Sequence, residues 1–261
     1  MRILFLGDVF GRPGRRILAN FLPEFKKKYN IDFVIANGEN VAGGQGITLN
    51  TYQKLISYGV DCITCGTHLW DKPEDAMQVT KSEKAWRFLR PANYPFIPGK
   101  GSEYFEPPGI GVINLLGRLY MPHPLIDCPF RTALKEIEKL REKTKVIIID
   151  FHAESVMEKK ALACYLDGKV TAVIGTHTHV QSADEEILPH GTAYLTDAGM
   201  VGSFNSIIGV KHEKSLAVFL TGIPHRFDTA YGEHKVNGVL IDADEKTGKA
   251  LSIKRVWCDA G

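Results

Sequence analysis

The stretch Gly175-Thr176-His177-Thr178-His179 contains the residue types best suited to hold a metal ion. It follows residues 170–174, an apolar and β-branched run typical of a buried strand. Two histidines separated by one residue point to the same side if the backbone is extended. Imidazole is the commonest protein ligand for metals. Alone, the pair is a weak signal, because exposed or hydrogen-bonded histidines can have the same spacing.

Four other apolar runs end in residues of similar chemistry. Asp8 follows residues 3–6, and Glu39 and Asn40 follow residues 31–36. Thr67 and His68 follow residues 60–65, and His152 follows residues 145–149. In open α/β sheets, ligands collect at the carboxyl ends of the strands. Histidines, two carboxylates and an amide suit two divalent ions, with one carboxylate bridging them. Two such ions can clamp the oxygens of a phosphoryl displacement and make a hydroxide from a bridging water.

Helices must separate these strands and cover them, because continuous apolar runs indicate strands buried on both faces. Helical spacing is found in residues 17–25, 48–58, 131–143 and around 158–166. After the two histidines the pattern changes to strands without helices, and the expected strands are 192–196, 215–220, 236–241 and 251–257. Residues 244–248 predict a hairpin turn between the last two.

Residues 86–130 differ from the rest of the chain. Their prolines and glycines indicate loops and edge strands, with a strand at 110–116. This interval is the best candidate for an insertion or a lid. No linker divides the chain, so we expect residues 1–261 to form a single domain.

The composition excludes several classes of protein. The chain has 261 residues, of which 44% are hydrophobic, and a net charge of +2, so charge makes no case for nucleic-acid binding. No stretch approaches a membrane span. Cys62 and Cys65 lie in or beside an apolar run, and we interpret them as buried free thiols. The apolar start is interrupted at Gly7-Asp8, too early for a signal peptide, so a cytoplasmic, reducing setting is the expectation.

Several longer strings resemble a known family. The order of Asp8, Glu39-Asn40, His68, His152 and His177-Thr-His179 resembles the calcineurin-like metallophosphoesterase superfamily. Its bacterial YmdB-like phosphodiesterase branch is more similar still, and the similarity extends over nearly the whole chain. The strings that carry it are residues 7–14, 36–40, 176–181 and 192–200. The resemblance implies a four-layer α/β/β/α sandwich, with which the pattern above is compatible.

The resemblance also implies a role for each candidate residue. Asp8, Asn40 and His179 would hold the first metal and Glu39 would bridge both. His152 and His177 would hold the second metal. His68 would stand beside the scissile phosphate and protonate the leaving oxygen.

Two positions depart from the superfamily pattern. Phe10 replaces a histidine, a change that the YmdB-like branch shares. Thr67 replaces an asparagine that normally offers its amide oxygen to the second metal. A threonine hydroxyl is shorter and a poorer neutral ligand. We therefore expect a second site that is weaker or is completed by water.

Four further residues have weaker interpretations. Arg12, near Asp8, could face an anionic substrate. Asp150 either orients His152 or simply ends the strand, and Asp197 could line the cleft. Asp71 could orient His68, but a role as N-cap of the following helix is favoured.

The expected function is hydrolysis of a small phosphodiester, with cyclic nucleotides such as 2′,3′-cyclic AMP as the substrate class that the resemblance implies. Attack would come from a metal-bridging hydroxide. Iron or manganese is the favoured ion, and zinc, cobalt and magnesium are compatible. The alternatives are a phosphomonoesterase or nucleotidase with the same site, and a regulatory protein that binds a nucleotide but turns over little. A homo-oligomer is compatible with the sequence.

Overall fold

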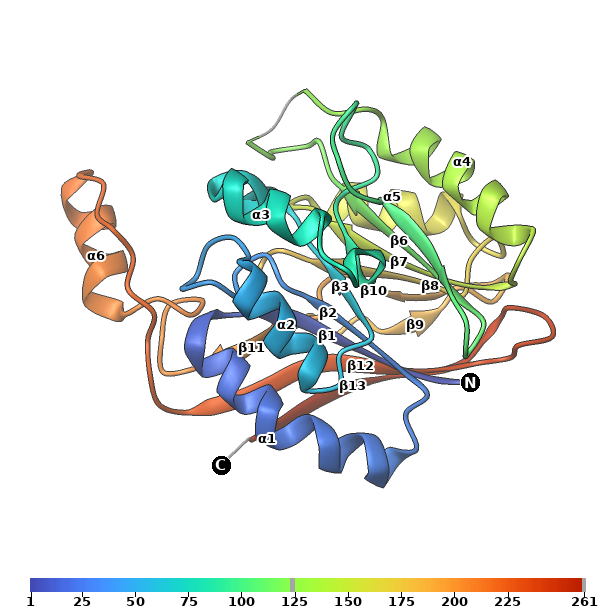
Figure 1. Ribbon diagram of the computed structural model, residues 1–261, viewed down its shortest axis with the longest axis horizontal. Coiled ribbons are helices and arrows are strands. Elements are labelled where there is room, and N and C mark those ends of the chain that lie inside the picture. The colour runs from blue at the N-terminus through green and yellow to red at the C-terminus, as the bar shows by residue number, and fades with distance from the viewer. Residues whose placement is uncertain (123–124, 260–261) are drawn as a thin grey trace.

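The computed structural model describes residues 1–122 and 125–259, which form two packed β-sheets with helices on both outer faces (Figure 1). The first sheet has the strand order β13–β12–β11–β1–β2–β3–β4. Its strands are β1 (Arg2–Val9), β2 (Phe33–Asn37), β3 (Cys62–Thr64), β4 (Phe88–Leu89), β11 (Met200–Ser203), β12 (His234–Ala243) and β13 (Ala250–Asp259). Strands β11, β1, β2, β3 and β4 run parallel, whereas β12 is antiparallel to its neighbours.

The second sheet has the order β5–β6–β7–β8–β10–β9. Its strands are β5 (Ser102–Phe105), β6 (Ile110–Leu116), β7 (Val146–His152), β8 (Ala172–Thr176), β9 (Glu186–Ile187) and β10 (Ala193–Leu195). Strands β6, β7, β8 and β10 are parallel. Both sheets therefore contain a set of parallel strands whose carboxyl ends can carry a shared site.

The continuous apolar runs of the sequence reflect burial on both faces of each sheet. In β1, Leu4 and Leu6 pack into the core beneath the helices, and Ile3 and Phe5 pack into the core between the sheets. Alternate side chains of a strand point to opposite faces, so a strand covered twice needs an apolar residue at every position.

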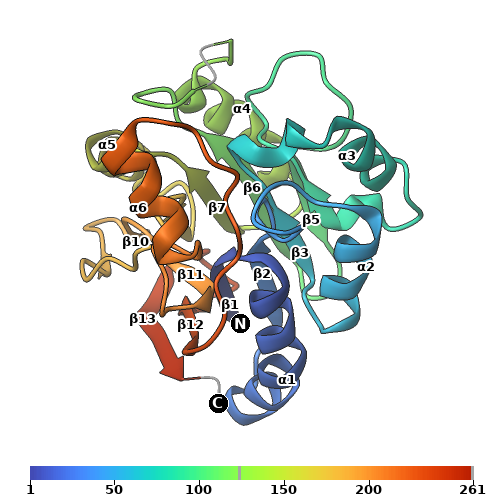
Figure 2. The same ribbon diagram turned by 90° about the vertical axis from the view of Figure 1, so that its left-hand side faces the viewer.

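Most of the helices cover the outer faces of the two sheets. The helices are α1 (Gly11–Tyr29), α2 (Leu49–Ser57), α3 (Pro73–Thr80), α4 (Pro129–Arg141), α5 (Val156–Tyr165) and α6 (His212–Thr221), with 3₁₀ turns η1 (Thr67–Asp71) and η2 (Ala85–Arg87). Helices α1–α3 share a core with the first sheet, and α4 and α5 share one with the second (Figure 2). The predicted four-layer α/β/β/α sandwich is confirmed. Within the described residues, no helix is long and apolar enough to cross a membrane.

The predicted strand at 215–220 is wrong, because these residues lie in α6. The helix projects away from the layers (Figure 1), and its Phe219 and Leu220 are largely exposed. An apolar run of this length is compatible with either structure, and no neighbouring strand among the described residues pairs with it. Gly222, with φ 70°, ends the helix in a left-handed cap. The hairpin predicted at 244–248 is confirmed by the antiparallel pairing of β12 with β13.

Residues 86–130 are partly built into the core. Strand β6 is completely buried and pairs with β7 along its whole length. This part of the interval is therefore a strand of the second sheet. That the neighbouring loops act as a lid stays a prediction, and residues 123 and 124 of the interval lie outside the described residues.

Candidate metal centre

The candidate residues lie at the carboxyl ends of parallel strands from both sheets. Asp8 is the last residue but one of β1 and is in register with Asn37, the last residue of β2, which Glu39 follows closely. In the other sheet, His152 ends β7 and is in register with Thr176 of β8, next to His177. The two sheets pack with these strand ends adjacent, so carboxylates that follow strands of one sheet lie close to imidazoles that follow strands of the other.

One group of side chains forms a possible metal-binding cluster. Glu39 Oε1 is 3.1 Å from His152 Nε2, which is 3.0 Å from His177 Nδ1. One ligand atom from each of these three residues lies within 4.8 Å of the others. Two of them are fully buried and His177 is partly exposed, so the cluster opens to solvent on one side.

A second group lies beside the first. His179 Nε2 is 3.2 Å from Asn40 Oδ1 and 3.8 Å from Asp8 Oδ1. Asn40 donates its amide to the carbonyl of Gly44, so its oxygen faces the histidine. Among the described residues, the buried Asp8 Oδ1 has no hydrogen-bond partner. Three acceptor atoms that face one another in a buried place fit a cation.

The outer nitrogens of His177 and His179 have acceptors of their own. His177 Nε2 is 3.2 Å from a Glu154 carboxylate oxygen, and His179 Nδ1 is 2.9 Å from the carbonyl of Ile208. Each partner takes the N–H of that nitrogen, so the tautomer leaves a lone pair on the nitrogen that faces the site. Such outer hydrogen bonds are typical of histidines that bind metal.

His152 is oriented by a buried relay that ends at Asp150. His152 Nδ1 is 2.9 Å from Thr176 Oγ1, whose hydroxyl donates to Asp150 Oδ1 at 2.7 Å. Thr64 and Asn37 donate to the other oxygen of Asp150. Of the two interpretations of Asp150, the geometry favours orientation of His152, acting through Thr176.

Electrostatics in the centre are dominated by buried negative charge. Burial raises the pKa of Asp8 well above its usual range. Burial lowers the pKa of His152, but Glu39, Asp8 and Asp150 outweigh it and raise this pKa to about 9. Burial and the neighbouring His152 lower the pKa of His177 to about 3. A proton on one imidazole thus partly offsets the carboxylates, and a divalent cation would do so more fully.

The two histidines of the central stretch do not lie in extended backbone, so the condition for both to point to the same side is not met. Strand β8 ends at Thr176, and the φ angles of His177 and His179 are 107° and 63°. Left-handed backbone is strained in such residues and needs support from its surroundings. Here Asp8 accepts the His177 N–H and Asp197 accepts the Thr178 N–H. The two histidines consequently face different groups of ligands.

Asp197 does not line the cavity as expected but holds this loop from behind. It is buried, accepts the Thr178 N–H at 3.0 Å and the Gly199 N–H at 2.9 Å, and pairs with Lys159 Nζ at 2.8 Å. Lys159 was not predicted from the sequence. The sequence does contain a signal, because Lys159 lies at helical spacing from two apolar residues of α5. It comes three residues before Leu162 and four before Ala163, and all three are buried on the same face of the helix.

His68 lies at the edge of the cluster. Its backbone N–H donates to Glu39 Oε2 at 3.1 Å, and its Nδ1 is 2.7 Å from Asp71. The favoured N-cap role of Asp71 is wrong, because α3 starts at Pro73 and its N-cap is Lys72. Asp71 instead accepts the imidazole N–H, which leaves Nε2 for chemistry.

Gly66 and Thr67, which precede His68, are closely packed. A Cβ on Gly66 would lie 2.1 Å from His152 Cδ2, so only glycine fits against this ring. A role for Gly66 was not predicted from the sequence, where its signal was its position shortly after a buried strand. Thr67 is buried at the start of η1, and its role as a ligand stays a prediction.

A cavity of about 400 Å³ gives access to the cluster. Its polar side includes Glu39, Asn40, His68, His177 and His179. Arg12 is exposed in the first turn of α1 and is not among the described residues that line this cavity. That Arg12 faces an anionic substrate stays a prediction.

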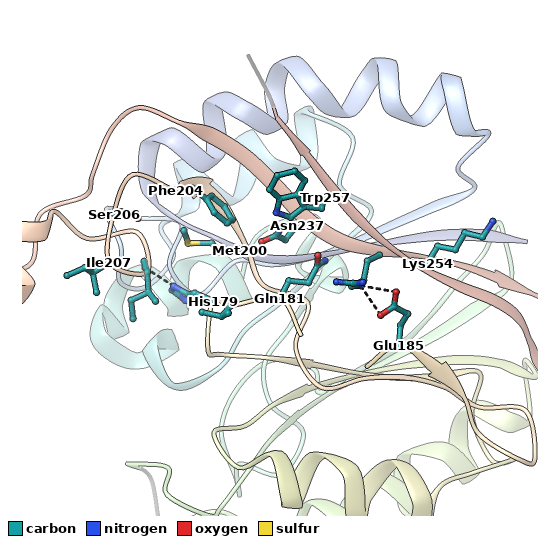
Figure 3. Close-up of a pocket in the computed structure, with 13 residues that line it drawn as sticks. His179, Gln181, Glu185, Met200, Phe204, Ser206, Ile207, Asn237, Lys254 and Trp257 are labelled. Atoms are coloured by element: carbon teal, nitrogen blue, oxygen red, sulfur yellow. Dashed lines mark hydrogen bonds and ion pairs between the residues drawn. The ribbon is translucent and has the colours of Figure 1, made fainter. Parts of the chain in front are cut away.

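A larger hollow of about 1010 Å³ lies on the other side of His179. Figure 3 shows its wall of Met200, Phe204, Asn237 and Trp257. Of the candidate ligands, His179 alone lines it, so the smaller cavity is the candidate reaction site.

A four-layer sandwich with acidic and histidine side chains gathered at the strand ends of both sheets is the architecture of a metallophosphoesterase-like protein. The comparisons with known proteins identify the branch. The family described as YmdB-like protein matches residues 4–256. The chain belongs to this family.

Individual relatives match along almost the whole chain. It is 47% identical over 259 residues to the 2′,3′-cyclic-nucleotide 2′-phosphodiesterase of Bacillus subtilis (strain 168), covering 98% of this chain and 96% of that protein. The crystal structure of a hypothetical protein from Thermus thermophilus matches with a TM-score of 0.91 and 40% identity over 99% of both chains. A novel phosphatase from Mycoplasma pneumoniae matches with a TM-score of 0.91 and 37% identity, over 99% of this chain and 93% of that one.

Proposed function

We propose that this protein is a phosphodiesterase that uses two divalent metal ions to hydrolyse small cyclic phosphodiesters such as 2′,3′-cyclic AMP. The observation that carries the proposal is the convergence of Glu39, His152 and His177 beside Asp8, Asn40 and His179 at the base of one cavity. The name of the Bacillus subtilis relative supports the substrate class.

The two groups of side chains would each hold one ion. Asp8, Asn40 and His179 would hold the first, His152 and His177 the second, and Glu39 would bridge them. When bound, the ions supply a nucleophilic water at neutral pH and stabilise the negative charge that develops on the phosphoryl oxygens. Fe, Mn, Zn, Co and Mg are all compatible with these nitrogen and oxygen donors, and Fe and Mn are favoured.

His68 is the proposed proton donor. Asp71 accepts from Nδ1 and keeps the ring turned so that Nε2 is available in the cavity. As the bond between phosphorus and the leaving oxygen breaks, a His68 ring protonated on both nitrogens would pass its Nε2 proton to this oxygen and become neutral. A monoester of the opened ring remains as product.

Hydrolysis assays with a diester and a monoester test the proposal. Protein loaded with manganese or ferrous iron is expected to hydrolyse 2′,3′-cyclic AMP and bis-p-nitrophenyl phosphate, and to do so faster than p-nitrophenyl phosphate; chelated protein should be inactive. Faster turnover of the monoester would favour the phosphomonoesterase alternative, which agrees with the description of the Mycoplasma pneumoniae relative as a phosphatase. No turnover with both metals bound would favour a regulatory nucleotide-binding protein.

Thr67→Asn is expected to tighten the second metal site by roughly tenfold, because an amide oxygen is a better neutral ligand and reaches further than a hydroxyl. Calorimetric titration of metal-free protein measures the affinities of both sites. The first site is the internal control and should not change. Two equally tight sites in the unmodified protein, or no gain in the variant, would contradict a special role for Thr67.

A further inference from the structure

One segment, residues 204–233, joins β11 to β12 and forms part of the wall of the candidate reaction site. It carries α6 away from the layers and then returns (Figure 1). At its base, Val210 bridges both Ile207 and Thr229, and the Ala230 N–H donates to the carbonyl of Gly209 at 2.9 Å. These backbone bonds hold the two ends of the segment together beside the cavity.

This segment contributes apolar side chains to the wall of the cavity. Ile208, Val210 and Phe227 line it together with Asp228 and Thr229 of the same segment. Phe227 is 48% exposed and belongs to none of the hydrophobic cores formed by the described residues. Its aromatic surface is therefore available to a ligand in the cavity.

A hydrogen bond connects the apolar wall directly to a candidate metal ligand. The carbonyl of Ile208 accepts the His179 N–H at 2.9 Å. Ile208 itself has φ 47°, a strained conformation that the neighbouring backbone bonds hold in place. A ligand with its phosphate at the cluster would thus meet the wall in a defined position.

We propose that Phe227, with Ile208 and Val210, forms the subsite that binds the base of a nucleotide substrate. This inference rests on the proposed function. A nucleoside phosphodiester has a flat aromatic base joined through a ribose to the phosphate, which matches a cavity lined both by these apolar side chains and by candidate metal ligands. Its volume of about 400 Å³ lies in the range of small-ligand sites.

The test compares a substrate that has a base with one that lacks it. For metal-loaded protein, the ratio of kcat/KM for 2′,3′-cyclic AMP to that for glycerol 1,2-cyclic phosphate is the readout. Phe227→Ala is expected to lower this ratio by about fivefold or more, since base–aromatic stacking contributes ~1–3 kcal/mol. Phe227→Tyr should keep the ratio near that of the unmodified protein.

Phe219→Ala is the matched control, because Phe219 is 82% exposed on α6 and does not line the cavity. Its ratio should not change. An unchanged ratio in Phe227→Ala, or an equal fall in Phe219→Ala, would overturn the subsite.

A binding assay separates failure of the subsite from failure of the proposed function. If neither diester is hydrolysed, the proposed function fails, and calorimetry of metal-loaded protein with AMP and with ribose 5-phosphate still tests the subsite. The subsite requires tighter binding of AMP and loss of that advantage in Phe227→Ala. Equal binding of the two ligands would refute it.

Discussion

Glu39→Gln is expected to lower kcat for the cyclic diester by roughly 10³-fold or more, because a bridging carboxylate holds both ions and neither alone gives the same stabilisation. Glutamine has the same shape but no charge. It can still accept the His68 N–H that Glu39 Oε2 accepts at 3.1 Å. The fold should therefore survive while the metal centre fails.

The charge state of Glu39 supports this expectation. Burial raises the pKa of Glu39, but His152 and His68 outweigh it and lower this pKa to about 2. The side chain is thus a carboxylate at neutral pH, even though it is only 1% exposed. Glutamine removes that charge from the centre of the cluster.

Metal content, kcat and the melting temperature of the metal-free protein are the measurements. Glu24→Gln is the matched control, because Glu24 is exposed on α1, and it should change none of them. Glu39→Gln should bind fewer metal ions and melt within a few degrees of the unmodified protein. A variant that keeps two ions and most of its activity would remove Glu39 from the bridging role.

Lys159→Met is expected to destabilise the protein by about 3–5 kcal/mol, because it leaves the buried carboxylate of Asp197 without its counter-charge. Lys159 and Asp197 are both almost completely buried, and their charged atoms are 2.8 Å apart. For a chain of this size the loss corresponds to a fall in melting temperature of roughly 6–20 °C. Thermal unfolding of metal-free protein measures it.

The adjacent lysine provides a matched control. Lys160 pairs with Glu186 at the surface, where both side chains are 40% or more exposed. Such pairs contribute about 1 kcal/mol or less, so Lys160→Met should change the melting temperature little. Equal effects of the two substitutions would show that the buried pair is not important for stability.

Lys159→Met is also expected to weaken metal binding. Asp197 holds the Thr178 N–H and thereby supports the left-handed backbone of His177 and His179. A displaced Asp197 would release both histidines from the positions that face the two groups of ligands. Metal titration of the folded variant below its melting temperature tests this separately from stability.

Pattern in the sequence was sufficient for the buried strands and for the residues at their ends, whereas the four layers followed from the resemblance to a known family. Continuous apolar runs such as 3–6 and 145–149 indicate strands covered on both faces, and these became β1 and β7. Parallel strands present their carboxyl ends at one edge of a sheet. The expectation that Asp8 and His152 meet rested on this rule, but they lie in different sheets, and the packing of one sheet on the other decides that they come together.

Local pattern was not sufficient where distant contacts decide the conformation. The strand predicted at 215–220 is a helix, because an apolar run alone cannot show whether a strand is available to pair with it. The left-handed backbone at His177 and His179 depends on hydrogen bonds to Asp8, Asp197 and Ile208, which are far away in the sequence.

What the sequence by itself determined was the set of chemical groups and the strand ends that carry them, because residue type and periodicity are local properties. Only the tertiary structure decided how each group is oriented. Contacts between separate elements place Lys159 behind the histidine loop and Phe227 in the wall of the cavity. Such contacts also connect His152 to Asp150 through Thr176. Burial and electrostatics at these places arise only when both sheets and the segment 204–233 are packed together.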